Sequence, residues 1–347
     1  MRLRRGFGQR LAVDLGTANT VVFRRGEGIV LFEPSVVAID ERSGVVQAVG
    51  EQARRMIGRT PASIRATRPL RHGVIADFEM TEQMLRYFIG RSGGAAAEVI
   101  VCVPSGITQV ERNAVVEAAL AAGARRAYLI DEPLAGAIGA GLPVGEAVGS
   151  MVVDVGGGTS EIAVTALGGM AVVHSIRVGG YELDEAIARY LQQHEQLLVG
   201  LEQAEALKLE IATAWAGESA SDAAEIAGRD LVTGLLRRRA VTAVSVGRAI
   251  EAPLRRIVAS VRDVLERTPP ELSSDVSAGG IMLVGGGALL RGFAQLLRHE
   301  TGLPVSIAEQ PLLTVARGAG KALEEIETLA RSRTQAAAAK PRRRRAW

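Results

Sequence analysis

Two short segments, 140 residues apart, carry the same arrangement of an aspartate, a turn of small residues and hydroxyl side chains. The first is Val13-Asp14-Leu15-Gly16-Thr17-Ala18-Asn19-Thr20, and the second is Val153-Asp154-Val155-Gly156-Gly157-Gly158-Thr159-Ser160. Each lies between two apolar runs, which predicts a strand, a tight turn and another strand. Such turns let backbone N–H groups approach an anion, hydroxyls add donors, and each aspartate can hold a hydrated Mg²⁺. Two facing hairpins would hold the phosphates of a nucleotide from both sides.

A third glycine turn, Gly285-Gly286-Gly287, lies between an apolar strand at 281–284 and a predicted helix that begins at Ala288. Its position suits the ribose and α-phosphate of a nucleotide, because a helix start presents free backbone N–H groups. The sequence has neither the P-loop pattern nor the GxGxxG pattern of dinucleotide-binding folds. Phosphate binding must therefore come from the paired hairpins.

Glu132 is the candidate for the group that orients an attacking water in line with the γ-phosphate. It follows the predicted strand at 127–130 and begins a helix, at the place where the chain should enter a cleft between two lobes. The helix dipole alone also favours an acid at this position, and this alternative stays open. Thr159 could donate to the same water or to the γ-phosphate, or it could be an ordinary turn hydroxyl.

The composition predicts a cytoplasmic protein. The 347 residues are 48% hydrophobic, yet no apolar run reaches the roughly 18 residues that a membrane span requires. The basic segment 1–10 is not followed by the apolar core of a signal peptide. The single cysteine, Cys102, lies in an apolar run and is expected to be buried, and the four scattered histidines have no metal-ligand spacing.

The charge is concentrated at the two ends of the chain. Arginine supplies all but three of the 41 basic residues, and the net charge is +3. The body of the chain is therefore nearly neutral, which argues against nucleic acid as a partner. The basic ends, with Leu3, Phe7 and Trp347 among their arginines, could attach to an anionic membrane surface or remain solvated tails.

The order of predicted elements repeats along the chain. It predicts an α/β fold of two lobes, with a duplicated βββαβα core and a nucleotide cleft between the lobes. We expect helices at about 182–198, 202–216, 245–266, 288–299 and 315–330, with 217–244 mixed. We expect a basic segment at 1–10, lobe I at 11–142 with a small insert at about 33–66, lobe II at 143–314 with a small insert at about 182–244, a helix at 315–333 that completes lobe I, and a basic tail at 334–347.

Motifs outside the glycine turns are more specific. They are EPSVVAI at 33–39, MIGRTP at 56–61, GVIADF at 73–78, VPSGIT at 103–108, TPPEL at 268–272 and GGGALLRG at 285–292. Together with the two hairpins, and over about residues 9–325, they resemble the bacterial actin homologues that determine cell shape, the MreB/Mbl family of the actin, Hsp70 and sugar-kinase superfamily. The resemblance implies an actin-like ATPase fold and filaments that assemble head to tail, since such a contact does not close on itself.

The resemblance also implies a slow ATPase with ATP and Mg²⁺ as cofactors. Asp14 and Asp154 would position Mg²⁺ through water, and Glu132 with Thr159 would place the attacking water. The phosphates would be bound by Thr17, Ala18, Asn19, Gly156, Gly157, Gly158 and Thr159, and the nucleotide would further contact Gly285, Gly286, Gly287 and Ala288. Glu205 and Lys208 would contact the ribose and adenine, or they could form an i,i+3 surface ion pair.

The implied partners are further copies of the chain and cell-wall-synthesis membrane proteins, at the inner face of the cell membrane. Two segments depart from the family. The loop at 90–97 has no large apolar residue for membrane insertion, and the segment at 212–244 could alter longitudinal filament contacts. Two other functions stay open, namely a nucleotide-gated paralogue that binds ATP and partners without long filaments, and a small-molecule kinase of the same superfamily.

Overall fold

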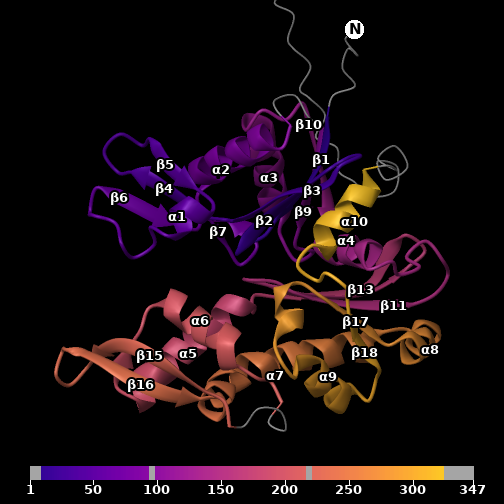
Figure 1. Ribbon diagram of the computed structural model, residues 1–347. Helices are drawn as coiled ribbons and strands as arrows, with labels where there is room; N and C mark the ends of the chain where they lie inside the picture. Colours follow the sequence, from indigo (N-terminus) through magenta and orange to yellow (C-terminus); the bar gives the residue numbers. More distant parts are fainter. Residues whose placement is uncertain (1–8, 94–97, 216–220, 324–347) are drawn as a thin grey trace, which may run out of the picture.

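Two five-stranded mixed sheets with the same strand order form the centres of two lobes (Figure 1). The computed structural model describes residues 9–93, 98–215 and 221–323. Sheet I has the order β10-β9-β1-β2-β3, and sheet II has the order β18-β17-β11-β12-β13. In both sheets three strands form an antiparallel meander. A fourth strand pairs in parallel with the first strand of the meander, and a fifth pairs in parallel with the fourth. The predicted duplication is confirmed.

The strands of sheet I are β1 (Arg10–Leu15), β2 (Asn19–Arg24), β3 (Gly28–Pro34), β9 (Glu98–Val103) and β10 (Arg126–Asp131). Those of sheet II are β11 (Ser150–Val155), β12 (Ser160–Ala166), β13 (Gly169–Ile176), β17 (Ile281–Val284) and β18 (Val305–Ile307). Every residue of β9 and β11 is buried, because helices cover both faces of these central strands. Cys102 on β9 is only 1% exposed, as expected.

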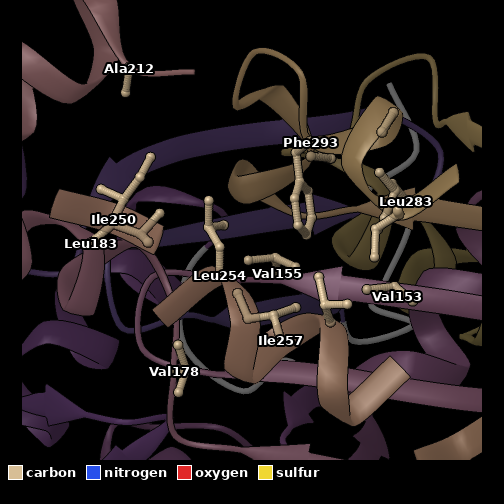
Figure 2. Packing of buried hydrophobic residues seen from close by; sticks show 14 of the residues in the cluster. Val153, Val155, Val178, Leu183, Ala212, Ile250, Leu254, Ile257, Leu283 and Phe293 are labelled. Atoms are coloured by element: carbon tan, nitrogen blue, oxygen red, sulfur yellow. The ribbon is translucent and has the colours of Figure 1, made fainter. Parts of the chain in front are cut away.

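Amphipathic helices cover the outer faces of both sheets. In lobe I these are α2 (Phe78–Arg91) and α3 (Gln109–Ala121), and α3 begins with a capping box between Thr108 and Glu111. In lobe II the long helix α7 (Ala243–Arg267) packs with α5 (Gly180–His194) and α9 (Phe293–Thr301) against sheet II. Figure 2 shows Leu254 and Ile257 of α7 beside Val155 of sheet II, and Ile250 of α7 beside Leu183 of α5.

Two short helices, α4 (Glu132–Gly139) and α10 (Thr314–Ala322), lie between the lobes (Figure 1). Ala135 of α4 packs in the core of sheet I, and Ala137, two residues later, packs against sheet II. A methyl group on Gly318 would overlap the carbonyl oxygen of Ala135, so glycine is required at this crossing. The two helices therefore lie between the cores of both lobes.

Each lobe carries a small insert. In lobe I, β4 (Val37–Asp40), β5 (Val46–Val49) and β6 (Ile64–Thr67) form a three-stranded sheet with α1 (Glu51–Arg54), and the hairpin of β7 (Leu70–Arg71) and β8 (Val74–Ile75) follows. In lobe II, β14 (Leu197–Leu198), β15 (Ala223–Asp230) and β16 (Leu236–Thr242) form a sheet beside α6 (Leu201–Ile211). The exact lobe and insert boundaries stay predictions.

Several predicted elements differ from the structure. The helix expected at 202–216 ends at Ile211, because the chain then forms a bridge from Thr213 to Arg291. The helix expected at 288–299 is divided into a 3₁₀ turn, η1 (Gly286–Leu289), and α9, since Gly292 between them has a left-handed backbone with φ 72°. The sequence analysis missed α8 (Pro270–Gly279) and β18.

Both termini, the part of the last predicted helix beyond residue 323, and positions 94–97 of the loop at 90–97 lie outside the described residues. What the sequence predicts for these segments therefore stays a prediction. Among the described helices, none has the length and apolar character needed to cross a bilayer.

Candidate nucleotide-binding site

The two repeated hairpin turns face each other across the cleft between the lobes. A methyl group on Gly157 of lobe II would lie 2.7 Å from the Ala18 side chain of lobe I, and one on Gly158 would lie 2.9 Å from Thr17 Oγ1. The two backbones thus approach each other as closely as glycine permits. Within each turn the ends are tied together, for example by the bond from the Gly156 N–H to the Thr159 carbonyl at 2.9 Å. The two predicted hairpin turns therefore lie opposite each other, one from each lobe.

The third glycine turn joins the same cleft from the end of β17. Gly285 has φ 79°, and a side chain there would collide with Asp154 Oδ1. The absence of side chains therefore lets the turn pass directly over the end of β11, beside the second hairpin. All three predicted turns converge at one place because β1, β11 and β17 end at the cleft.

These turns surround a pocket of about 400 Å³. Fourteen of the sixteen predicted site residues line it, namely Asp14, Thr17, Ala18, Asn19, Glu132, Asp154, Gly156, Gly157, Thr159, Glu205, Lys208, Gly285, Gly286 and Gly287. The other two do not line the pocket. Gly158 is the point of closest approach to Thr17 and His72, and Ala288 is fully buried behind the third turn.

Three acids line the pocket together: Asp154 and Glu132 are buried, and Asp14 is half-buried. Burial raises the pKa of Asp14 to about 7, and burial together with the nearby Asp14 and Glu161 raises the pKa of Asp154 to about 8. The pKa of Glu132, which is 8% exposed at the start of α4, is raised well above its usual range by burial and by the charge of Glu161. Among the described residues, no basic side chain offsets the raised pKa values of Asp14 and Asp154.

This donor set fits a hydrated divalent cation. Two buried carboxylates that repel each other are stabilised by a dication between them, and Mg²⁺ usually keeps several waters while it is held by one or two carboxylates and phosphate. Among the described residues, no group of three or more His, Cys, Asp or Glu side chains could hold a metal ion by themselves. Asp14 and Asp154 therefore suit a cation that arrives with the phosphates.

Glu161, which the sequence did not predict as a site residue, is a further buried acid near the pocket. It lies on β12 in lobe II, opposite Asp154 in the strand register. Its carboxylate accepts hydrogen bonds from the Ser105 N–H at 3.1 Å and the Ser105 hydroxyl in lobe I, and from the Ser175 hydroxyl in lobe II. Glu161 thus ties the two lobes together beneath the pocket, next to Glu132.

Glu205 and Lys208 on α6 do not form the surface ion pair that was the alternative reading of their spacing, so that alternative is wrong. The Lys208 ammonium lies 2.7 Å from Asp184 Oδ1 and donates to the Gly180 carbonyl at 3.0 Å. Asp184 is 2% exposed, and burial raises its pKa to about 7 in spite of the neighbouring lysine. Glu205 faces the pocket and pairs with Arg54 of lobe I.

Apolar side chains line the other end of the pocket. Leu209 is 74% exposed, Leu289 55% and Leu312 40%, although all three border the pocket. Exposed leucines gathered around a concave site offer a surface that a planar apolar group, such as a nucleotide base, would cover. The pocket therefore has a polar end with glycine turns and acids, and an apolar end that suits a base.

The β7–β8 hairpin of lobe I also reaches the site, although the sequence did not predict it. The tip of the β7–β8 hairpin, His72 and Gly73, reaches the two phosphate-type loops, where the Gly73 N–H donates to Thr17 Oγ1 at 2.9 Å. His72 lies 3.2 Å from Glu182 on α5 of lobe II. The Arg-His-Gly turn is visible in the sequence, but its proximity to Thr17 arises only from the folded arrangement.

Two sheets of identical topology, a cleft between them and opposed hairpin turns at the strand ends define the class of actin-like nucleotide-binding proteins. The structure of MreB 5 of Spiroplasma citri bound to AMPPNP matches this fold with a TM-score of 0.88 at 31% identity, covering 94% of this chain and 99% of that one. The same protein has also been solved bound to ADP.

The sequence comparisons agree with the structural one. The chain is 50% identical over 330 residues to the cell shape-determining protein MreB of Escherichia coli K12, covering 92% of this chain and 95% of the relative. It is 45% identical over 327 residues to the cell shape-determining protein Mbl of Bacillus subtilis 168, covering 93% and 98%. The family model described as MreB/Mbl protein matches residues 8–331. The chain therefore belongs to the MreB/Mbl family.

Proposed function

We propose that this chain is a bacterial actin homologue that binds Mg–ATP between its lobes, hydrolyses it slowly, and assembles head to tail into filaments that organise cell shape and cell-wall synthesis. The single observation that carries the proposal is the direct opposition of Gly157 and Ala18 across the cleft. A phosphate chain held there would contact backbone N–H groups of both lobes at once. Membership of the family supports the cell-shape role.

The proposed division of labour follows from the position of each residue. Thr17, Ala18 and Asn19 would bind the phosphates from lobe I, and Gly156, Gly157 and Thr159 would bind them from lobe II. Gly158 would keep the two loops in contact, and Gly285, Gly286, Gly287 and Ala288 would form the turn beside the ribose. Glu205 would contact the ribose, while Lys208, which pairs with Asp184, would hold α6 and α5 together beside it.

Asp14 and Asp154 would hold hydrated Mg²⁺, which, when bound, neutralises charge on the phosphates. Glu132 would accept a hydrogen bond from the attacking water, and Thr159 would donate to the γ-phosphate or to the same water. Because burial favours the protonated form of Glu132 in the apoprotein, its ionised form would depend on positive charge arriving in the cleft. Glu132 would then be ready to orient the attacking water only when Mg–ATP is bound.

The partners of this proposal are further copies of the chain and cell-wall-synthesis membrane proteins, in the cytoplasm at the inner face of the cell membrane. AMPPNP and ADP bound to the Spiroplasma citri relative support the nucleotide. Any membrane affinity would reside in the basic termini, which lie outside the described residues. Binding of anionic liposomes by the full chain, lost on deletion of residues 1–9 and 335–347, is the expected result for that part.

Electron microscopy of the purified chain with Mg–ATP, Mg–ADP or no nucleotide tests the proposal. We expect filaments with Mg–ATP and few or none without nucleotide. Nucleotide binding without filaments under all conditions would favour the nucleotide-gated paralogue. Transfer of the γ-phosphate to an added sugar, measured against release of free phosphate, would favour the kinase. Either result would contradict the proposed function.

A further inference from the structure

A second cavity, also of about 400 Å³, lies in lobe II between α5 and α7, which are neighbours in Figure 1. It shares no lining residue with the nucleotide pocket. On α5 its lining spans residues 182–193, and on α7 it spans residues 248–256. At a rise of about 1.5 Å per residue these stretches are about 16 and 12 Å long. The cavity is therefore an elongated groove along a helix seam, which we name the α5–α7 groove.

Three arginines line the α5–α7 groove, namely Arg189 on α5 and Arg248 and Arg256 on α7. All three are exposed, and none forms an ion pair with another described residue. Arg255, the neighbour of Arg256 on α7, does not line the groove and is paired with Glu251. The groove is thus lined by three guanidinium groups without an ion-pair partner among the described residues, whereas Arg255 outside the groove is neutralised by Glu251.

The acids of the groove only partly offset this charge. Glu182 accepts a hydrogen bond from the Gly179 N–H at 2.6 Å and lies 3.2 Å from His72, so its carboxylate is already engaged. Glu185 is the other acidic lining residue, one turn before Arg189 on the same helix. The resulting surface has an excess of positive charge toward Arg189 and a single free carboxylate beside it.

The floor of the groove is made of small side chains. Ala186 on α5 and Ala249, Ala252 and Pro253 on α7 leave room for another chain to lie close to the helices. Pro253 is inside α7 and has no N–H, so the Ala249 carbonyl lacks its usual donor four residues later. The groove therefore combines small side chains with arginine donors, which suits a peptide whose carboxylates can pair with guanidinium groups.

We propose that the α5–α7 groove binds a short acidic segment of a partner protein. The length of the groove fits about four or five extended residues, which is more than a single small anion would occupy. A nucleic-acid backbone is disfavoured, because Glu182 and Glu185 line the same groove as the arginines and would face its phosphates. The proposal is independent of the nucleotide site, so it can fail or succeed separately from the proposed function.

The test is the fluorescence anisotropy of a labelled hexaglutamate peptide with the full chain at low salt, without nucleotide. We expect saturable binding that weakens with added salt, and a loss of at least about tenfold in affinity when Arg189→Ala, Arg248→Ala and Arg256→Ala are combined. Ala252→Glu, which places a carboxylate on the groove floor, should also weaken binding. The matched control Arg255→Ala removes an exposed arginine of the same helix outside the groove and should leave the affinity within about twofold.

The proposal is overturned if the peptide does not bind, or if the triple variant and Ala252→Glu both bind it as the parent chain does. Single-stranded RNA and phosphatidylserine vesicles are tested in the same way. The proposal is also overturned if the parent chain binds either of them more tightly than the peptide, and the triple variant loses that binding by the same factor as it loses peptide binding. Competition by inorganic phosphate alone, at concentrations equal to those of the peptide, would reduce the site to a simple anion site and would contradict the peptide assignment.

Discussion

Arg54 in the insert of lobe I lies 3.5 Å from Glu205 on α6 of lobe II, across the mouth of the nucleotide pocket. Arg54 also lies 3.4 Å from Glu202, which Arg68 of lobe I contacts at 2.8 Å. The Arg68 guanidinium lies 4.8 Å from the centre of the Tyr181 ring on α5. These contacts form a latch between the two lobes, and Glu205 would belong both to the latch and to the ribose site.

The latch should slow the release of nucleotide. We expect the double variant Arg54→Ala, Arg68→Ala to release a fluorescent ADP analogue about threefold to tenfold faster in stopped-flow measurements, because each partly exposed ion pair contributes roughly 0.2–1 kcal/mol. Arg55→Ala is the matched control, since Arg55 is paired with Glu51 inside lobe I. Equal release rates for the parent and the double variant would show that the latch does not control the cleft.

Asp14 and Asp154 should lower the folding stability of the apoprotein and raise the affinity of the protein for Mg–ATP. We expect Asp14→Asn and Asp154→Asn each to lower the affinity for Mg–ATP at least about tenfold in calorimetry, since a carboxylate ligand is lost. At about pH 8 the same variants, without nucleotide, should unfold at a higher temperature, because ionising a buried carboxyl is costly and its removal is worth roughly 1–3 kcal/mol. Unchanged Mg–ATP affinity in both variants would remove these residues from the site.

The buried acids also predict how stability depends on pH. Asp14 and Asp184 have pKa values raised to about 7, and Asp154 to about 8. Between the unfolded value near 4 and these values, the folded apoprotein binds more protons than the unfolded chain, so stability falls as pH rises. We therefore expect the melting temperature of the apoprotein to decrease from about pH 5.5 to about pH 8.5 and then to level off.

Calorimetric scans over this range, with and without saturating Mg–ATP, check the pH dependence. The slope should become shallower with Mg–ATP, since positive charge near Asp14 and Asp154 favours their ionised forms. A melting temperature that rises steadily with pH in the apoprotein would contradict the raised pKa values.

A substitution at Glu132 tests whether this residue orients the attacking water or is only an acid that stabilises the start of a helix. We expect Glu132→Ala to bind ATP like the parent but to hydrolyse it at least about tenfold more slowly, a loss of about 1.4 kcal/mol of transition-state stabilisation. Glu111→Ala is the control, because Glu111 is a half-buried acid in the first turn of α3 and lies outside the pocket. Phosphate release at the parent rate in Glu132→Ala would leave Glu132 only the helix-start role.

The sequence predicted the parts of the site that local chemistry determines. Asp14, Asp154 and the three glycine turns stand at strand ends, where a short apolar run followed by small residues has few other structural meanings. Arg54, Tyr181 and Asp184 also line the pocket, but they lie on inserts and helices whose placement depends on how the lobes close. No local pattern distinguishes them from surface charges or ordinary core residues.

The elements of the fold were likewise predictable where the local sequence determines them, and were missed where they depend on neighbouring elements. The repeated meander was predictable because its strands alternate with clear glycine turns. Helix α8 was missed because Pro269 and Pro270 stop α7, although Pro270 also provides the first residue of the next helix. Strand β18 was missed because only Val305 of its three residues is buried, so its pairing with β17 supplies the structure that its own sequence does not indicate.

The most direct test of the central claim is sedimentation of the full chain with Mg–ATP, compared with the same chain carrying Asp14→Asn and Asp154→Asn together. We expect the parent chain to enter the pellet with Mg–ATP and to stay in the supernatant without nucleotide. The double variant should remain folded and stay in the supernatant under both conditions. Equal pelleting of the parent and the double variant, with or without Mg–ATP, would contradict the claim that nucleotide in the cleft drives assembly.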